Sequence, residues 1–166
     1  MSNMAETGSL HDAFVDELRD TYDAERQLTK ALAKLAKAAS SPDLKDAFSS
    51  HLEETRGQIE RLEKVFEMLG KPARGVQCEA INGLIEEGKE VMEDFADSAA
   101  LDAGILAAAQ AVEHYEITRY GSLKTWAEEL GMRDAAKLLD QNLQEEKKTD
   151  LLLTKLAEAR VNTKAA

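Results

Sequence analysis

Apolar residues recur every three or four positions along four long stretches of this chain, which is the spacing of one face of an α-helix. These stretches span about residues 9–39, 41–70, 98–130 and 133–160. Only two prolines interrupt the sequence, and no segment alternates apolar and polar residues as a half-buried strand does. The pattern therefore predicts an all-α protein built from four long helices.

The helices are expected to form one domain, because 166 residues is a common size for a single hydrophobic core. We expect residues 1–8 to be a disordered polar N-terminus, residues 9–160 to form the bundle, and residues 161–166 to fray. Ser9 is a candidate N-cap for the first helix, with Asp12 completing a capping box.

The connections between the predicted helices differ greatly in length. Ser41 and Pro42 begin the second helix immediately after the first, and Gly131 separates the third from the fourth. Residues 73–97 contain three glycines, and within them residues 78–95 can form one or two short helices. Two tight helix pairs joined by one long crossover is the topology of a ferritin-like four-helix bundle.

Charge and cysteine content exclude several classes of partner. The chain has 21 Lys and Arg against 32 Asp and Glu, so its net charge of -11 disfavours nucleic acid and anionic membranes. No apolar run approaches the roughly 18 residues that span a bilayer, and the N-terminus lacks the pattern of a signal peptide. With Cys78 as the single cysteine there is no internal disulfide, so we expect a cytoplasmic protein.

Each of the four apolar stripes is interrupted by acidic or amide side chains on its inward face. Glu25 and Glu54 lie almost equally far from the turn between the first two helices, and Glu116 and Glu146 lie almost equally far from Gly131. At a rise of about 1.5 Å per residue, all four helices place these residues in one layer. The polar residues predicted to point inward are Glu25, Glu54, Gln58, Glu113, Glu116, Glu146 and Asp150.

Burying several carboxylates together is prohibitive without positive charge, since each unpaired buried ion costs several kcal/mol. Hard oxygen ligands from four helices suit two closely spaced iron ions, with manganese as the alternative. We therefore predict that all seven residues surround a dinuclear iron or manganese site. The competing interpretation is a set of partly exposed glutamates paired with Arg26, Arg56, Arg119 or Lys147 at the surface.

The same regions resemble a known family. The segments LRDTYDAERQL, HLEETRGQIERLE, AAAQAVEHYEITRYGSL and LQEEKKTDLLLTKLAE are similar to those of the YciE/YciF family, ferritin-like proteins of the bacterial stress response. The resemblance covers about residues 10–159 and implies a ferritin-like bundle, a homodimer and a dinuclear metal site. It does not imply a particular reaction.

The chain departs from the more distant rubrerythrin and ferritin pattern at one kind of ligand. Those proteins usually carry Glu-x-x-His on the second or fourth helix, whereas here Gly57 follows Glu54 and Thr149 follows Glu146 at that spacing. Gln58 and Asp150, one residue further on, are the candidate replacements.

Three other residues have open roles. His51 and His114 flank acidic residues, so each is either a ligand or, as is more common for a lone helical histidine, a hydrogen-bonded structural group. Cys78 is either an oxidisable thiol or a small buried side chain.

Two functions remain open from the sequence. The first is a di-metal stress-response protein that takes O₂ or peroxide as its small-molecule substrate, with ferroxidase-like or peroxide-consuming chemistry. The second is a non-enzymatic bundle that acts as an interaction scaffold with a structural or vestigial metal.

Overall fold

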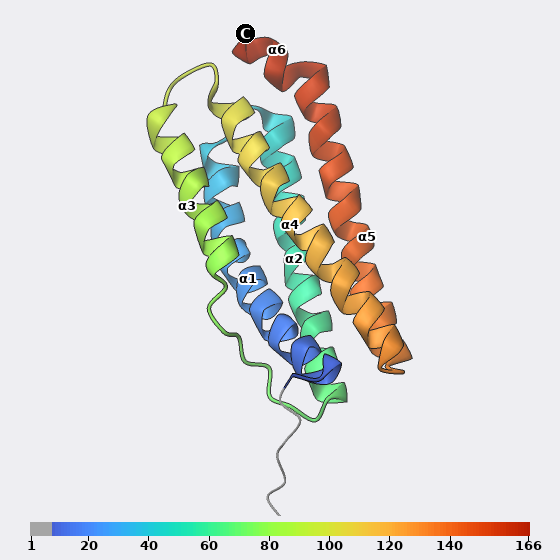
Figure 1. Ribbon diagram of the computed structural model, residues 1–166. Coiled ribbons are helices and arrows are strands. Elements are labelled where there is room, and N and C mark those ends of the chain that lie inside the picture. The colour runs from blue at the N-terminus through green and yellow to red at the C-terminus, as the bar shows by residue number, and fades with distance from the viewer. Residues whose placement is uncertain (1–7) are drawn as a thin grey trace, which may run out of the picture.

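The computed structural model describes residues 8–166, and within that range all regular secondary structure is helical, with no strand. Four long helices form two antiparallel pairs: α1 (Leu10–Ala38) with α2 (Pro42–Met68), and α4 (Leu101–Glu129) with α5 (Arg133–Leu156) (Figure 1). The predicted all-α bundle is confirmed. The predicted disordered segment lies outside the described residues except for Gly8.

Local signals place the tight turns where the sequence predicted them. The Ser9 hydroxyl accepts a hydrogen bond from the Asp12 amide, and the Asp12 carboxylate accepts one from the Ser9 amide, which completes the capping box. Ser41 caps α2 with Pro42 at its first position. Gly131 has φ +73°, a left-handed conformation that glycine adopts without strain and that ends α4.

The crossover contains one helix, α3 (Glu79–Asp94), which lies beside α1 and α4 (Figure 1). The extended chain before it is fixed to α1, because the Asp23 carboxylate accepts a hydrogen bond from the Cys78 amide at 2.8 Å. At Gly75 the two backbones approach so closely that a Cβ would lie 2.9 Å from the Cβ of Asp23. α3 therefore forms a cover over one side of the bundle.

The apolar core has one large cluster toward each end of the bundle and a smaller third cluster where α3 packs on α1 and α4, which includes Leu28, Ile81 and Val112. Phe14, Leu62, Phe66 and Leu139 belong to the cluster near Gly131. The other large cluster includes Leu35, Leu44, Phe48, Ile105 and Leu153. Polar residues occupy the interior between these two large clusters, and these residues form the site described below.

The C-terminal end continues past α5 through a π-helical turn, Ala157–Val161, into the short helix α6 (Asn162–Ala165). Val161 is buried in the cluster that contains Leu35 and Leu44. The fraying expected for residues 161–166 concerns motion and stays a prediction.

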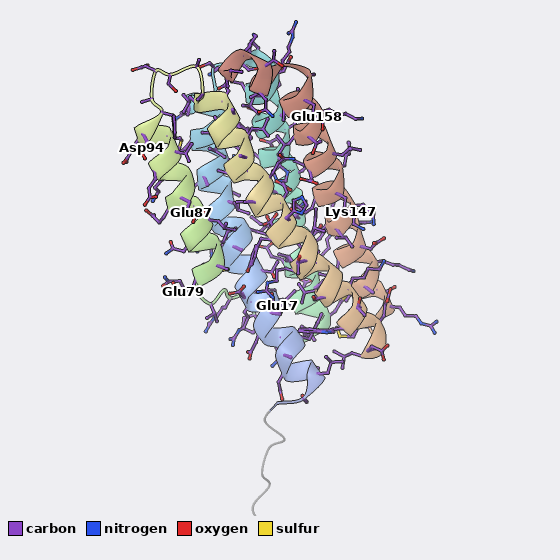
Figure 2. All side chains as sticks on the ribbon, turned by 45° about the horizontal axis from the view of Figure 1, so that its top comes forward. Glu17, Glu79, Glu87, Asp94, Lys147 and Glu158 are labelled. Atoms are coloured by element: carbon purple, nitrogen blue, oxygen red, sulfur yellow. The ribbon has the colours of Figure 1, made fainter. Side chains whose placement is uncertain are left out.

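Charged side chains cover the outside of the bundle. Figure 2 shows Glu79, Glu87 and Asp94 projecting from α3, Lys147 from α5, and Glu158 from the π-helical turn that follows α5. Within residues 8–166, none of the helices combines the length and the apolar character that crossing a membrane requires.

Candidate metal centre

A layer of buried polar side chains crosses the interior of the bundle between the two apolar clusters. Each of α1, α2, α4 and α5 contributes to it, with buried acids on α1, α4 and α5 and a histidine, a threonine and a glutamine on α2. The buried polar side chains that are at most 3% exposed are Thr21, Glu25, His51, Thr55, Gln58, Glu113, Glu116, Asn142 and Glu146.

Four of these side chains form the centre of the layer. One ligand atom from each of His51, Glu113, Glu116 and Glu146 lies within 4.8 Å of the other three. His51 Nε2 is 2.7 Å from Glu113 Oε1 and 3.7 Å from Glu146 Oε2. Nε2 nevertheless has no correctly aligned hydrogen-bond acceptor, so these atoms lie close together without a hydrogen bond from the imidazole.

Unsatisfied oxygen atoms are the feature of the layer that best suits it to hold a cation. Leaving a buried acceptor without a partner costs about 1–3 kcal/mol, and more when it is charged. Both carboxylate oxygens of Glu116 and both of Glu146 lack a hydrogen-bond donor, as does one oxygen in each of the neighbouring residues Glu25, Glu113 and Gln58. Carboxylates with an imidazole and no thiolate form a donor set suited to iron or manganese, so the residues present fit such ions.

The electrostatics of the metal-free layer oppose ionisation of its acids. Burial, together with the charge of Glu146, raises the pKa of Glu25 from 4.5 to about 8. Burial and neighbouring carboxylates also raise the pKa of Glu116 and Glu146 well above their ordinary value. Burial disfavours the charged form of His51, but the carboxylates of Glu146 and Glu113 outweigh it and raise the histidine pKa. Without metal, the layer therefore retains protons that a cation would displace.

Glu25 is held in position by a tyrosine from the opposite helix pair. The Tyr120 hydroxyl donates a hydrogen bond to Glu25 Oε1 at 2.5 Å, and both side chains are fully buried. Glu25 Oε2 has no donor and remains available to a cation.

Gln58 is oriented by charged residues farther from the centre. Its amide nitrogen donates to Glu145 Oε2 at 3.2 Å, and Arg61 holds Glu145 with contacts of 2.8 and 2.9 Å. Asn142 connects this group to the backbone of α2, since its side-chain amide nitrogen donates a hydrogen bond to the backbone carbonyl of Gln58. With its nitrogen engaged, Gln58 leaves its buried amide oxygen unsatisfied.

Two predicted ligands, Glu54 and Asp150, lie outside the buried layer, whereas Glu25 and Gln58 lie in the layer but are not among its four central residues. Glu54 is 30% exposed and accepts a hydrogen bond from Thr149 at 3.2 Å. Asp150 is 21% exposed and pairs with the exposed His114 at 3.2 Å, and it also accepts from Gln110.

Helix register explains the placement of these two residues. The buried face of α2 carries His51, Thr55 and Gln58, which follow i, i+4, i+7 spacing and turn Glu54 to the side. On α5 the same face continues from Glu146 to Thr149, not to Asp150. At the i, i+3 spacing of Glu-x-x-His, the buried pairs in this chain are therefore Thr55 with Gln58 on α2 and Glu146 with Thr149 on α5.

His51 is the member of the cluster that the sequence left undecided. Its signal was its place on the inward stripe of the second helix, in line with Gln58 and Leu62.

Cys78 is buried and lies apart from the centre. Its sulfur is 3.1 Å from the Tyr115 hydroxyl and 3.2 Å from Asp20 Oδ2.

The fold and this cluster define a ferritin-like helical bundle with a buried histidine–carboxylate centre. The chain belongs to the family described as a domain of unknown function, DUF892, which matches residues 9–166. It is 53% identical over 158 residues to Protein YciF of Escherichia coli (strain K12), covering 95% of each chain. The resemblance found in the sequence is thereby confirmed.

Solved structures show the same relationship. The crystal structure of the E. coli stress protein YciF matches with a TM-score of 0.89 and 52% identity, covering 94% of this chain and 99% of that one. YcfI from Rhodopseudomonas palustris matches with a TM-score of 0.87 and 50% identity, covering 91% and 96%. A protein from Xanthomonas campestris, 23% identical with a TM-score of 0.75 over 95% and 96% of the two chains, shares the fold.

Proposed function

We propose that this chain is a stress-response protein that binds a dinuclear iron centre, or a manganese one, in the buried layer. The observation that carries the proposal is the set of buried oxygens without hydrogen-bond donors on Glu25, Glu113, Glu116 and Glu146. An apolar or hydrogen-bonded interior would be more stable, so a cluster of this kind is best explained by a cation that it binds.

The residues have distinct parts in this proposal. His51 and the central carboxylates supply the inner ligands, Glu25 is held ready by Tyr120, and the Gln58 amide oxygen adds a neutral donor. Bound iron or manganese supplies one-electron chemistry and an open coordination position for O₂ or peroxide. The two apolar clusters exclude bulk water from both sides of the layer.

Metal titration with a conservative variant tests the proposal. Glu146→Gln keeps the shape of the side chain and removes its charge, and Glu60→Gln is the control because Glu60 is exposed on α2. In wild type, Fe²⁺ or Mn²⁺ at about 100 times Kd should raise Tm by about 5–10 °C, following mass action on the folded state.

The two variants should differ both in metal-free stability and in their response to metal. Metal-free Glu146→Gln should be more stable than wild type by about 1–3 kcal/mol, because it removes the cost of burying an acid that folding forces to take up a proton, and should lose most of the metal-induced shift. Glu60→Gln should keep both properties of wild type. If no first-row divalent ion stabilises the wild-type protein, the metal proposal fails.

A peroxide-decay assay separates this function from the scaffold alternative. Protein loaded with two equivalents of metal should consume peroxide, and its bound metal should change oxidation state during turnover. A protein that binds metal and never cycles it would be a structural metalloprotein. We also infer that the protein is cytoplasmic and forms a homodimer. Light scattering of the purified chain tests the homodimer.

A further inference from the structure

A cavity of about 280 Å³ lies between α1, α3 and α4, beneath the crossover helix. Its walls are mainly aliphatic, with Leu28, Leu32, Ile85, Met92 and Val112 among them. Ordinary ligand pockets have volumes of about 300 Å³ and more, so this cavity lies close to the lower end of that range. It therefore suits one small, mainly apolar ligand.

The cavity exists because short side chains from three helices face one another. Ala31 of α1, Gly88 of α3, and Ala108 and Ala109 of α4 all line it. A Cβ added at Gly88 would meet only the Cβ of Ala108, at 3.9 Å, so the helices are not in close contact there. The space is therefore part of the helix packing and does not depend on one displaced side chain.

One wall of the cavity belongs to the candidate metal centre. Glu113 lines the cavity, is 1% exposed, and has an Oε2 atom with no hydrogen-bond partner. A ligand in the cavity would therefore lie against a member of the central cluster.

The outer rim of the cavity is positively charged, unlike the molecule as a whole. Lys30 and Lys34 are exposed on α1, one turn apart, and within residues 8–166 no carboxylate oxygen lies within 4 Å of either ammonium group. Lys89, also on the rim, pairs with Glu86. In a chain of net charge -11, two free lysines beside an apolar opening favour an anionic headgroup.

We propose that this cavity binds a single-chain amphipathic anion of the fatty-acid class. Its carboxylate lies at Lys30 and Lys34, and its short apolar chain extends between α1, α3 and α4 toward Glu113. Binding in the cavity is independent of metal, whereas the position of the chain end beside the metal centre rests on the proposed function.

Decanoate is the probe, and the methyl group of Met92 is the reporter. In protein carrying ¹³C-methyl methionine, decanoate should shift the NMR signal of Met92, which lines the cavity, and leave that of the exposed Met68 unchanged. Decanol and decylamine carry the same chain with no charge and with a positive charge. We expect decanoate to bind most tightly and decylamine least.

Two lysine variants of equal net charge test the headgroup position. Lys30→Glu combined with Lys34→Glu should weaken decanoate binding by about tenfold and change decanol binding little. Lys64→Glu combined with Lys71→Glu reverses two exposed lysines away from the cavity and should retain decanoate binding. Ala31→Phe fills the cavity and should abolish binding of both ligands. If it fails to fold, the exposed lysine variants still decide.

Manganese loading tests the direction of the chain. Paramagnetic Mn²⁺ in the centre should broaden the terminal methyl signal of bound decanoate more than the signal of the CH₂ beside its carboxylate. If the protein takes up no manganese, the proposed function fails while the Met92 shift still reports binding. An unshifted Met92 signal overturns the fatty-acid proposal. So does an equal affinity of the two lysine variants for decanoate.

Discussion

At the scale of single residues, stability and ligand capacity oppose each other in the polar layer. Glu25, Glu116 and Glu146 are fully buried acids whose pKa values are raised, so the metal-free protein is most stable when they are protonated. The same carboxylates must be ionised to bind a cation. Proton and metal therefore compete for one set of oxygens.

This competition predicts how stability depends on pH. For Glu25 the folded pKa of about 8 exceeds the ordinary 4.5, so its contribution is full below pH 4.5 and is lost as pH rises toward 8. Each such group contributes up to about 1.4 kcal/mol per pH unit. Urea unfolding of metal-free protein from pH 5 to 8 should show falling stability, and Glu25→Gln should flatten the slope. Stability that rises over this range would contradict the prediction.

The orientation of Gln58 gives a second prediction at this scale. Glu145→Ala removes the acceptor that holds the Gln58 amide nitrogen, so the amide oxygen is no longer directed toward the centre. We expect metal affinity to fall about tenfold, as is typical when residues that orient ligands are lost. Isothermal titration measures it, with Glu60→Ala as the exposed control. Unchanged affinity would mean that Gln58 is not a ligand.

At the scale of helices, the sequence was sufficient where the signals are local and insufficient where rotation of a helix matters. The capping box at Ser9, Pro42 at the start of α2 and Gly131 at the second turn follow from short-range chemistry, so these boundaries were predictable. The inward face of α2 was not, because neighbouring positions such as Glu54 and Thr55 differ by only 100° of rotation. Packing of α2 against α5 decides between them.

The crossover provides a prediction for an element. Gly75→Ala places a Cβ 2.9 Å from the Cβ of Asp23, so the chain must move away from α1 and weaken the Asp23–Cys78 hydrogen bond. We expect a loss of about 1–3 kcal/mol of folding stability by urea unfolding. Gly83→Ala is the control, because it lies in α3 with open space around it and should stabilise by up to about 1 kcal/mol. Equal effects of the two changes would show that the crossover is not fixed at Gly75.

At the scale of the whole molecule, the polar layer separates the two end clusters of the core and draws on all four long helices. Its buried polar side chains come from α1, α2, α4 and α5, whereas α3 supplies none of them. A cation in the layer would therefore join the four long helices directly and leave α3 attached only through its packing on α1 and α4. The sequence predicted the layer from matched heights, but it could not show that α3 lies outside this connection, because that requires the path of the crossover.

Hydrogen exchange tests this division of the molecule. Addition of iron or manganese should slow amide exchange most in the middle of the four long helices, around Glu25, His51, Glu116 and Glu146, because any opening there must release the metal. Amides of α3 can exchange by local detachment that leaves the layer intact, so their rates should change much less. In metal-free protein, the same four segments should be less protected near pH 8 than at pH 5, once the exchange rates are corrected for the intrinsic rate at each pH. Equal protection of α3 and the long helices on metal addition would mean that the crossover opens only when the entire bundle unfolds.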